Sequence, residues 1–133
     1  MAEVVIEGGA ELARKLAALG EAVAGDVLAA AVRSGGLLVE ADAKRRAPYR
    51  TGTLRRSIHV EVEAGAGKAE ATVGTDVPYG ARIEFGFDGK DSLGREYHQP
   101  PRPYLRPALD ENMDAAAQEM GDALRAAILA VAT

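Results

Sequence analysis

Cysteine and tryptophan are absent from this 133-residue chain, and aromatic residues make up 5% of it. Without cysteine there is no disulfide framework, no thiolate metal site and no cysteine nucleophile. No apolar run approaches the roughly 18 residues that a membrane span requires. Glu3 and Glu7 stand where a signal peptide would be basic and then apolar. We therefore expect a soluble, unexported protein that is made in a reducing compartment.

Large hydrophobic side chains are also scarce. Of 63 apolar residues 27 are alanine, which leaves 36 larger ones to fill a core. A chain of this length suits one domain, since domains average roughly 150 residues. Alanine adds little bulk between packed helices and loses no side-chain entropy in them. The composition predicts a single domain over residues 1–133 with a thin core and closely approaching helices.

The charge is unevenly distributed. The net charge of −4 argues against a dedicated nucleic-acid binder of high pI. Residues 43–60 nevertheless hold six basic residues and no acid, while the rest of the chain has ten basic and twenty acidic residues. The basic residues are Lys44, Arg45, Arg46, Arg50, Arg55 and Arg56. Because complementary potentials set orientation and register, two copies could meet head to tail.

Apolar residues at steps of three and four predict helices over residues 10–19 and 21–46. Gly35 and Gly36 weaken the middle of the second helix, since an interior glycine costs about 1 kcal/mol relative to alanine. Pro48 ends it, because its ring disfavours the helical conformation at the preceding residue.

Strict alternation of apolar and polar residues predicts strands over residues 58–63 and 68–73, joined by a glycine turn. A third strand is predicted over 79–85. Residues 86–102 show no periodicity and indicate a long loop, which is either functional or mobile in a compact domain. The expected sheet is an antiparallel meander with one solvated face.

A last helix is predicted from about Leu105 to Val131, with Pro107 in its first turn. Some 25 residues would span about 37 Å and overhang a small sheet. Ile128 and Val131 at its far end would then need a neighbouring subunit. The fold class is α+β: an antiparallel β-meander of about three to four strands packed against a long N-terminal helix and a long C-terminal helix.

The chemistry-bearing residues form no catalytic or metal-binding pattern. His59 and His98 are isolated and lack metal-ligand spacing. The acids of residues 88–96 do not match a calcium loop. The hydroxyl residues of 51–57 lack a nearby histidine and acid that would activate a nucleophile. We expect no enzyme, no cofactor and no metal site.

Three segments occur in a fixed order after the alanine-rich helix: APYRTGTLRRSI (residues 47–58), VPYGARIEFG (77–86) and PPRPYLRPALDEN (100–112). Together they resemble the tail-component family of long-tailed bacteriophages and prophages, which is similar in role to the lambdoid minor tail protein Z. Tyr104 stands where the family usually has phenylalanine, and Phe87 where many members have threonine. The 86–102 loop is longer than typical.

The resemblance implies a non-enzymatic neck or tail-completion protein of the virion, synthesised in the bacterial host cytoplasm. It would form a homo-oligomeric ring between a head-closure or connector protein and a tail terminator or tail tube, with no membrane. DNA would pass through the lumen without sequence-specific binding. Candidate partner-binding residues are Arg45, Arg46, Arg50, Arg55, Arg56, Glu84, Tyr97, Ile128 and Val131, with Glu84 expected to pair with an arginine.

Two other functions are weighed against this interpretation. A nucleic-acid-binding regulator would use the basic segment from Lys44 to Arg56, although Tyr49 alone interleaves an aromatic ring there for base stacking. A small hydrolase has no positive support in the sequence.

Overall fold

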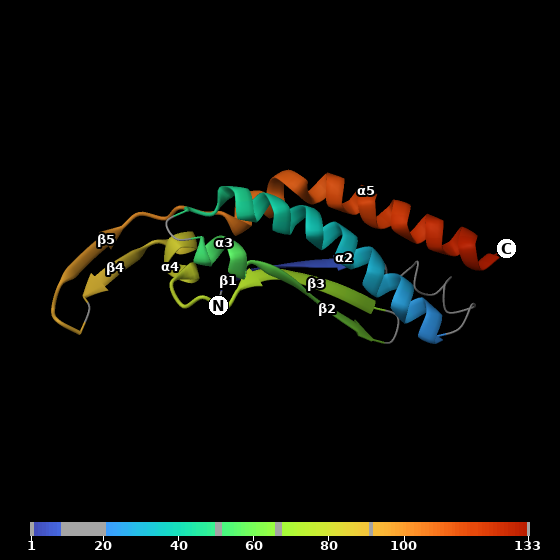
Figure 1. Ribbon diagram of the computed structural model, residues 1–133, viewed down its shortest axis with the longest axis horizontal. Helices are drawn as coiled ribbons and strands as arrows, with labels where there is room; N and C mark the ends of the chain where they lie inside the picture. Colours follow the sequence, from blue (N-terminus) through green and yellow to red (C-terminus); the bar gives the residue numbers. More distant parts are fainter. Residues whose placement is uncertain (1, 9–20, 50–51, 66–67, 91, 133) are drawn as a thin grey trace.

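The computed structural model describes residues 2–8, 21–49, 52–65, 68–90 and 92–132. The elements, in chain order, are β1 (Ala2–Gly8), α2 (Glu21–Arg46), α3 (Thr53–Ser57), β2 (His59–Gly65), β3 (Lys68–Thr75), α4 (Gly80–Phe85), β4 (Phe87–Lys90), β5 (Glu96–Gln99) and α5 (Leu105–Ala132). Figure 1 shows an elongated α+β molecule with both long helices on one side of a sheet. The predicted fold class is confirmed. The helix expected over residues 10–19 lies outside the described residues.

The main sheet has three antiparallel strands in the order β1-β3-β2. The hairpin of β2 and β3 follows the predicted alternation, and Val60 lies opposite Val73 in the register. Ala71 and Val73 are fully buried beneath the helices. The third strand is β1 and not residues 79–85 as the sequence pattern indicated, so β3 occupies the centre of the sheet.

Helix α2 packs against α5 on one side and against the sheet on the other, and its two central glycines allow both neighbours to approach closely. Gly35 faces α5, where an added Cβ would lie 2.5 Å from Met120 Cε and 3.1 Å from the Ala116 carbonyl oxygen. Gly36 faces the sheet, where a Cβ would lie 3.0 Å from Val60 Cγ1. The glycines that weaken the helix intrinsically therefore permit close approach on both sides. The helix ends at Arg46, as the following Pro48 predicts.

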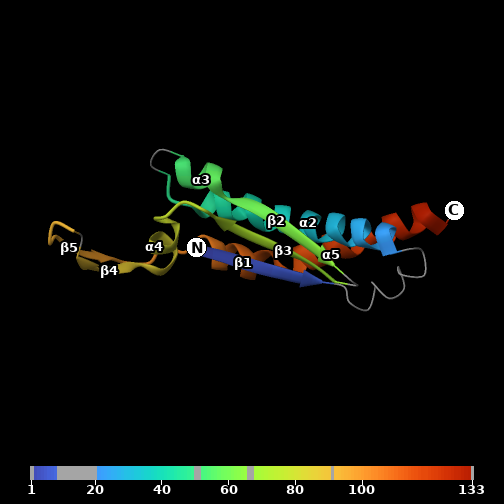
Figure 2. The ribbon, with the colours of Figure 1, turned by 90° about the horizontal axis from the view of Figure 1, so that it is seen from below.

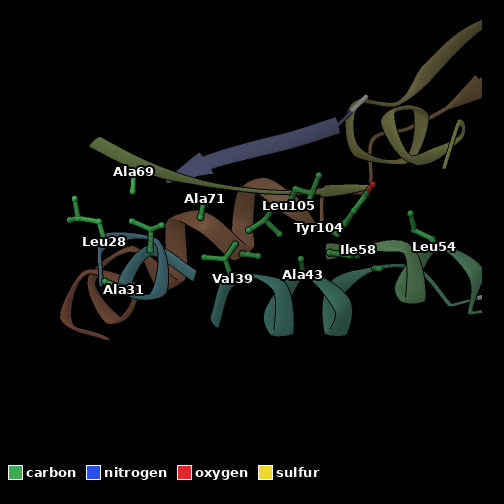
Figure 3. Packing of buried hydrophobic residues seen from close by; sticks show 14 of the residues in the cluster. Leu28, Ala31, Val39, Ala43, Leu54, Ile58, Ala69, Ala71, Tyr104 and Leu105 are labelled. Carbon is green, nitrogen blue, oxygen red and sulfur yellow. The ribbon is translucent and has the colours of Figure 1, made fainter. Parts of the chain in front are cut away.

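The core lies between α2, α5 and the sheet (Figure 3). Its small members, such as Ala31, Ala43 and Ala71, bring the layers close together, and Leu28 and Val39 fill the space between them. The sixteen described hydrophobic residues of this core are Leu28, Ala31, Val32, Val39, Ala43, Ala47, Leu54, Ile58, Ala69, Ala71, Val73, Tyr104, Leu105, Ala108, Ala116 and Leu124. The predicted alanine-rich packing is thus observed.

Residues 79–85 form helix α4 and not a strand, which corrects the sequence interpretation. The Gly80 amide donates to the Val77 carbonyl (2.9 Å), and the Ile83 amide donates to that of Tyr79 (3.1 Å). Gly80 and Glu84, four residues apart, share the buried side of this short helix. A segment of only seven residues is compatible with both the helical and the strand pattern of apolar residues. Burial of Glu84 against the start of α5 favours the helix.

The segment predicted as a loop over residues 86–102 contains a second, two-stranded sheet. Strands β4 and β5 pair antiparallel, from Phe87 opposite Gln99 to Lys90 opposite Glu96. This hairpin projects away from the helices and the main sheet in both ribbon views (Figures 1 and 2). Helix α5 then runs back along the body for 28 residues, about 42 Å.

Candidate assembly interface

In the described part of the basic segment, Lys44, Arg45 and Arg46 form ion pairs within the subunit. Lys44 pairs with Glu40 one turn earlier (3.0 Å). Arg45 and Arg46 both bind the carboxylate of Asp42, at 2.8 and 3.0 Å. Arg46 also binds Glu111 of α5, so this cluster ties the two long helices together. These three side chains offer less free positive charge than the sequence indicates.

Asp42 is the centre of that cluster and is only 6% exposed. It also accepts a hydrogen bond from the side-chain amide of Asn112 on α5 (2.7 Å). Burial by itself raises the pKa of Asp42, but hydrogen bonds from Arg46 and Asn112, together with the charges of Arg46 and Arg45, outweigh it and hold that pKa below its usual value. The ionised carboxylate is therefore a structural element of the fold.

Two of the remaining predicted arginines, Arg55 and Arg56, lie in the short helix α3 that follows α2. Gly52 adopts a left-handed conformation (φ 81°) that precedes α3. Leu54 is buried below α3, as the family pattern implies. The Arg55 guanidinium stacks over the ring of Tyr49, 4.8 Å from its centroid. Arg56 is exposed, and Arg50 lies outside the described residues.

Glu84 has a different role from the expected pairing with an arginine. Its side chain is buried and receives the backbone amides of Tyr104 (2.6 Å), Leu105 (3.0 Å) and Arg106 (2.9 Å). These are donors of the first turn of α5 that the helix itself leaves unpaired. Glu84 therefore anchors α5 to α4 within one subunit, and its carboxylate is not available to a partner.

Tyr104 completes this anchor. Its hydroxyl donates to the Gly80 carbonyl (3.0 Å), and the ring is fully buried. Burial, the charge of Glu84 and the proximity of Tyr79 raise the pKa of the Tyr104 phenol, so the hydroxyl stays a donor. The tyrosine found where the family usually has phenylalanine is thus accommodated by a specific hydrogen bond.

The β4–β5 hairpin carries Tyr97, the aromatic residue among the predicted partner-binding positions. Its ring is partly exposed and lies 6.3 Å from that of Phe87. Arg82 of α4 stacks on the other aromatic residue, with its guanidinium 4.0 Å from the Phe87 centroid. Leu93 and Phe85 are exposed near the tip and the base of the hairpin. The projecting segment thus presents apolar and cationic groups together.

The far end of α5 contains Ile128 and Val131, whose side chains lie outside the described part of the structure. Between them in sequence, Leu129 is 67% exposed. The hypothesis that this end meets a neighbouring subunit stays a prediction.

His59 meets two carboxylates that its sequence spacing did not indicate. Its Nδ1–H donates to the Ser57 carbonyl (2.8 Å), and Nε2 lies 3.0 Å from Glu61 and 3.9 Å from Asp76. The hydrogen bond to Ser57 and the Glu61 carboxylate raise the pKa of His59. Ligand atoms of all three groups lie within 4.8 Å of one another, an arrangement that exposed acidic groups commonly adopt without a metal ion. Asp76 comes from beyond β3, so sequence spacing could not reveal the group.

Nucleophilic chemistry has no support at this place. The Ser57 hydroxyl donates to the Leu54 carbonyl (2.6 Å) and lies 2.5 Å from Thr75 Oγ1. In the described contacts His59 reaches Ser57 through the backbone carbonyl. A serine engaged in this way lacks the activating base that acyl transfer needs.

The sheet face opposite the helices is acidic. Glu61 and Glu63 of β2 are exposed, and Glu70 of β3 is half-buried on the same side. Figure 1 shows no described helix covering this face. The negative charge of this face contrasts with the positive charge of Arg55 and Arg82 at one end of the molecule.

No helix in the described ranges combines the length and apolar character needed to cross a bilayer.

A family model described as "Bacteriophage HK97-gp10, putative tail-component" matches residues 10–86. This match includes α2, α3, the β2–β3 hairpin and α4. Searches of curated proteins and of solved structures give no match.

Proposed function

The chain belongs to the HK97-gp10 family of phage tail components, and from this premise we propose that it is a structural virion protein of a long-tailed phage or prophage-like particle. Several copies form a ring that helps to join the head connector to the tail. The subunit acts by binding and not by catalysis. Its neighbours in the particle are a head-closure or connector protein on one side and a tail terminator or tail tube on the other.

One observation carries this proposal: in the described part of the chain, one face of the main sheet and the projecting β4–β5 hairpin lie outside the packing of the two long helices. The described helices cover one face of the main sheet, and none of them lies on the other face (Figure 1). The β4–β5 hairpin extends beyond the body with Tyr97 and Leu93 exposed. Exposed apolar groups on a projecting segment are typical of surfaces that bind another protein.

The ion pairs of the basic segment argue against its use as a DNA-binding site. Lys44, Arg45 and Arg46 are engaged with acids of the same subunit. A DNA-binding segment needs several cations free to neutralise phosphates, since each phosphate contact adds to the salt dependence of binding. This internal pairing weakens the alternative of a nucleic-acid-binding regulator.

Deletion of the gene from a phage or inducible prophage tests the proposal. We expect complete heads and complete tails that remain unjoined in electron micrographs, with infectivity restored by a plasmid copy of the gene. Gold-labelled antibody against the chain should mark the neck of wild-type particles. Joined, infectious particles at wild-type yield after deletion would refute the role in joining.

A silent variant provides the control for expression. A plasmid that encodes Asp114→Asn, at an exposed position on α5, should restore joining as well as the wild-type gene does. A plasmid with Glu84→Ala should restore it poorly, because α5 loses its anchor.

A further inference from the structure

Two glutamates of the open sheet face are placed side by side, with Lys68 two residues before Glu70 on the same face. Glu63 of β2 lies directly opposite Glu70 of β3 in the register. Directly opposed residues have Cβ atoms about 5 Å apart, and like charges at that spacing destabilise a sheet. Neither carboxylate has a hydrogen bond or an ion pair within the described part of the chain. Even with Lys68 beside it, this pair of carboxylates is net negative, so an external cation would lower the remaining repulsion.

Two exposed arginines at the other end of the sheet have a positive charge that is complementary to these glutamates. Arg82 of α4 and Arg102 are both exposed, and neither has a carboxylate partner among the described residues. The Arg102 amide donates to the Ile83 carbonyl (2.7 Å), so the two arginines belong to adjacent backbone segments. Arg82 stacks on Phe87. A stacked guanidinium keeps its N–H edge available for a carboxylate.

The two pairs lie at opposite ends of the sheet and cannot meet within one subunit. Glu70 is near the start of β3, whereas α4 follows from the end of β3 at Thr75. The five residues from Glu70 to Thr75 span about 17 Å of extended strand. Figures 1 and 2 show α4 at one end of the sheet and the joined ends of β2 and β3 at the other.

We propose that the open sheet face of one copy, at Glu63 and Glu70, is the seat for Arg82 and Arg102 at the base of the hairpin of a second copy. This inference rests on the proposed function and specifies the contact between neighbours in the ring. The occupant is a second copy because the same chain carries, at the base of its hairpin, two exposed arginines whose charge is complementary to that of the two glutamates.

The contact is heterologous, since the two surfaces of each copy differ. After each copy is added, the growing assembly still has one free acidic face and one free pair of arginines. A closed ring forms when the rotation from one copy to the next adds up to a full turn. Its attraction depends on charge, so it weakens as salt shortens the screening length from about 30 Å at 0.01 M to about 8 Å at physiological ionic strength.

The experiment is a charge-reversal cycle on the full-length protein. One variant carries Glu63→Arg with Glu70→Arg, a second carries Arg82→Glu with Arg102→Glu, and a third carries all four changes. The matched control reverses Asp114→Arg with Glu119→Arg, two exposed carboxylates of α5 without an ion pair among the described residues. Association is measured by analytical ultracentrifugation at millimolar protein and low salt, with circular dichroism to verify folding.

We expect the wild-type chain and the control to associate, and each pair reversal to weaken association about tenfold or more. The fourfold variant restores association, because the charges are exchanged across the same contact. Mixing the two pair reversals also restores it, since one provides free cations and the other free carboxylates. These two rescues exclude misfolding as the reason for the individual losses.

A wild-type chain that stays monomeric under these conditions overturns the proposed contact, as does association that survives both pair reversals or fails to recover in the fourfold variant. Loss of association in the α5 control to the same extent also overturns it, because net charge would then be the cause. The gene-deletion experiment is independent of these results. A role in joining can stand while this contact fails, and the contact can stand while the role fails.

Discussion

Replacing Glu84 with alanine removes the acceptor that holds the first turn of α5. Three backbone amides, those of Tyr104, Leu105 and Arg106, donate to this buried carboxylate at 2.6 to 3.0 Å. The two residues that carry the first two of these amides, Tyr104 and Leu105, are buried as well, so water cannot readily replace the lost acceptor.

The size of the effect follows from these contacts. Hydrogen bonds to a charged group contribute about 1.5–3 kcal/mol each, and a buried donor left unsatisfied costs about 1–3 kcal/mol. Because the three bonds share one group and are not additive, we expect a loss of about 3–5 kcal/mol in the free energy of unfolding. Typical domains have about 5–15 kcal/mol in total. The Glu84→Ala variant should therefore be strongly destabilised.

Glu84→Gln separates charge from shape. The amide oxygen of glutamine can keep the two amides that share Oε2, from Tyr104 and Leu105. It loses the bond from Arg106 and the favourable interaction of a negative charge with the helix N-terminus, which contributes about 0.3–2 kcal/mol. We expect this variant to lose about half as much stability as Glu84→Ala.

Urea denaturation followed by circular dichroism measures both variants against Glu63→Ala. Glu63 is exposed on β2 without a described partner, so its replacement should change stability by no more than about 0.5 kcal/mol. A Glu84→Ala variant as stable as Glu63→Ala would show that the carboxylate does not anchor α5, and the reasoning would be wrong.

Three further predictions concern buried polar groups and pH. Tyr104→Phe removes the hydroxyl that donates to the Gly80 carbonyl and should cost about 1–2 kcal/mol by urea denaturation; an unchanged midpoint contradicts it. Asp42 has a lowered pKa, so its stabilisation is present above the usual value of 3.8 and is lost as pH falls below it. Stability curves of Asp42→Asn should therefore be flatter in acid than those of the wild type, and parallel curves refute this. His59 has a raised pKa, so its contribution is complete below 6.5 and disappears as pH rises through the higher folded value. His59→Gln should abolish that alkaline loss, and a wild-type-like slope in the variant excludes the assignment.

Local signals in the sequence were sufficient for the long elements. The helix predicted over residues 21–46 is α2 with those bounds, because a sustained period and a following Pro48 define it. Alternation predicted β2 and β3 within two residues at each end. Pro107 falls in the first turn of α5, where its missing amide is not needed.

Short segments were predicted less well. Residues 79–85 alternate apolar and polar like a strand but form α4, since seven residues contain too few periods to separate the two patterns. The β4–β5 hairpin has no apolar alternation because both its faces are largely solvent-exposed. Burial against a core produces the periodic pattern, and an exposed hairpin lacks that constraint.

At the candidate interface, too, the sequence predicted the local charge pattern and missed the contacts between distant residues. The sequence identified a basic segment, and the structure pairs Lys44, Arg45 and Arg46 with acids, including Glu111 of α5. Opposed glutamates at positions 63 and 70 also become apparent only in the register of the hairpin.

The order of residues alone determined the α+β class, the two long helices, the thin alanine-rich core and the family resemblance. These depend on local periodicity and on composition, which are properties of neighbours along the chain. The tertiary structure decided that Glu84 anchors α5, that Gly35 and Gly36 let α2 pack on two sides, and which charges are left unpaired. Hydrogen bonds, close approach and ion pairs depend on distances between residues far apart in the chain, and folding alone sets those distances.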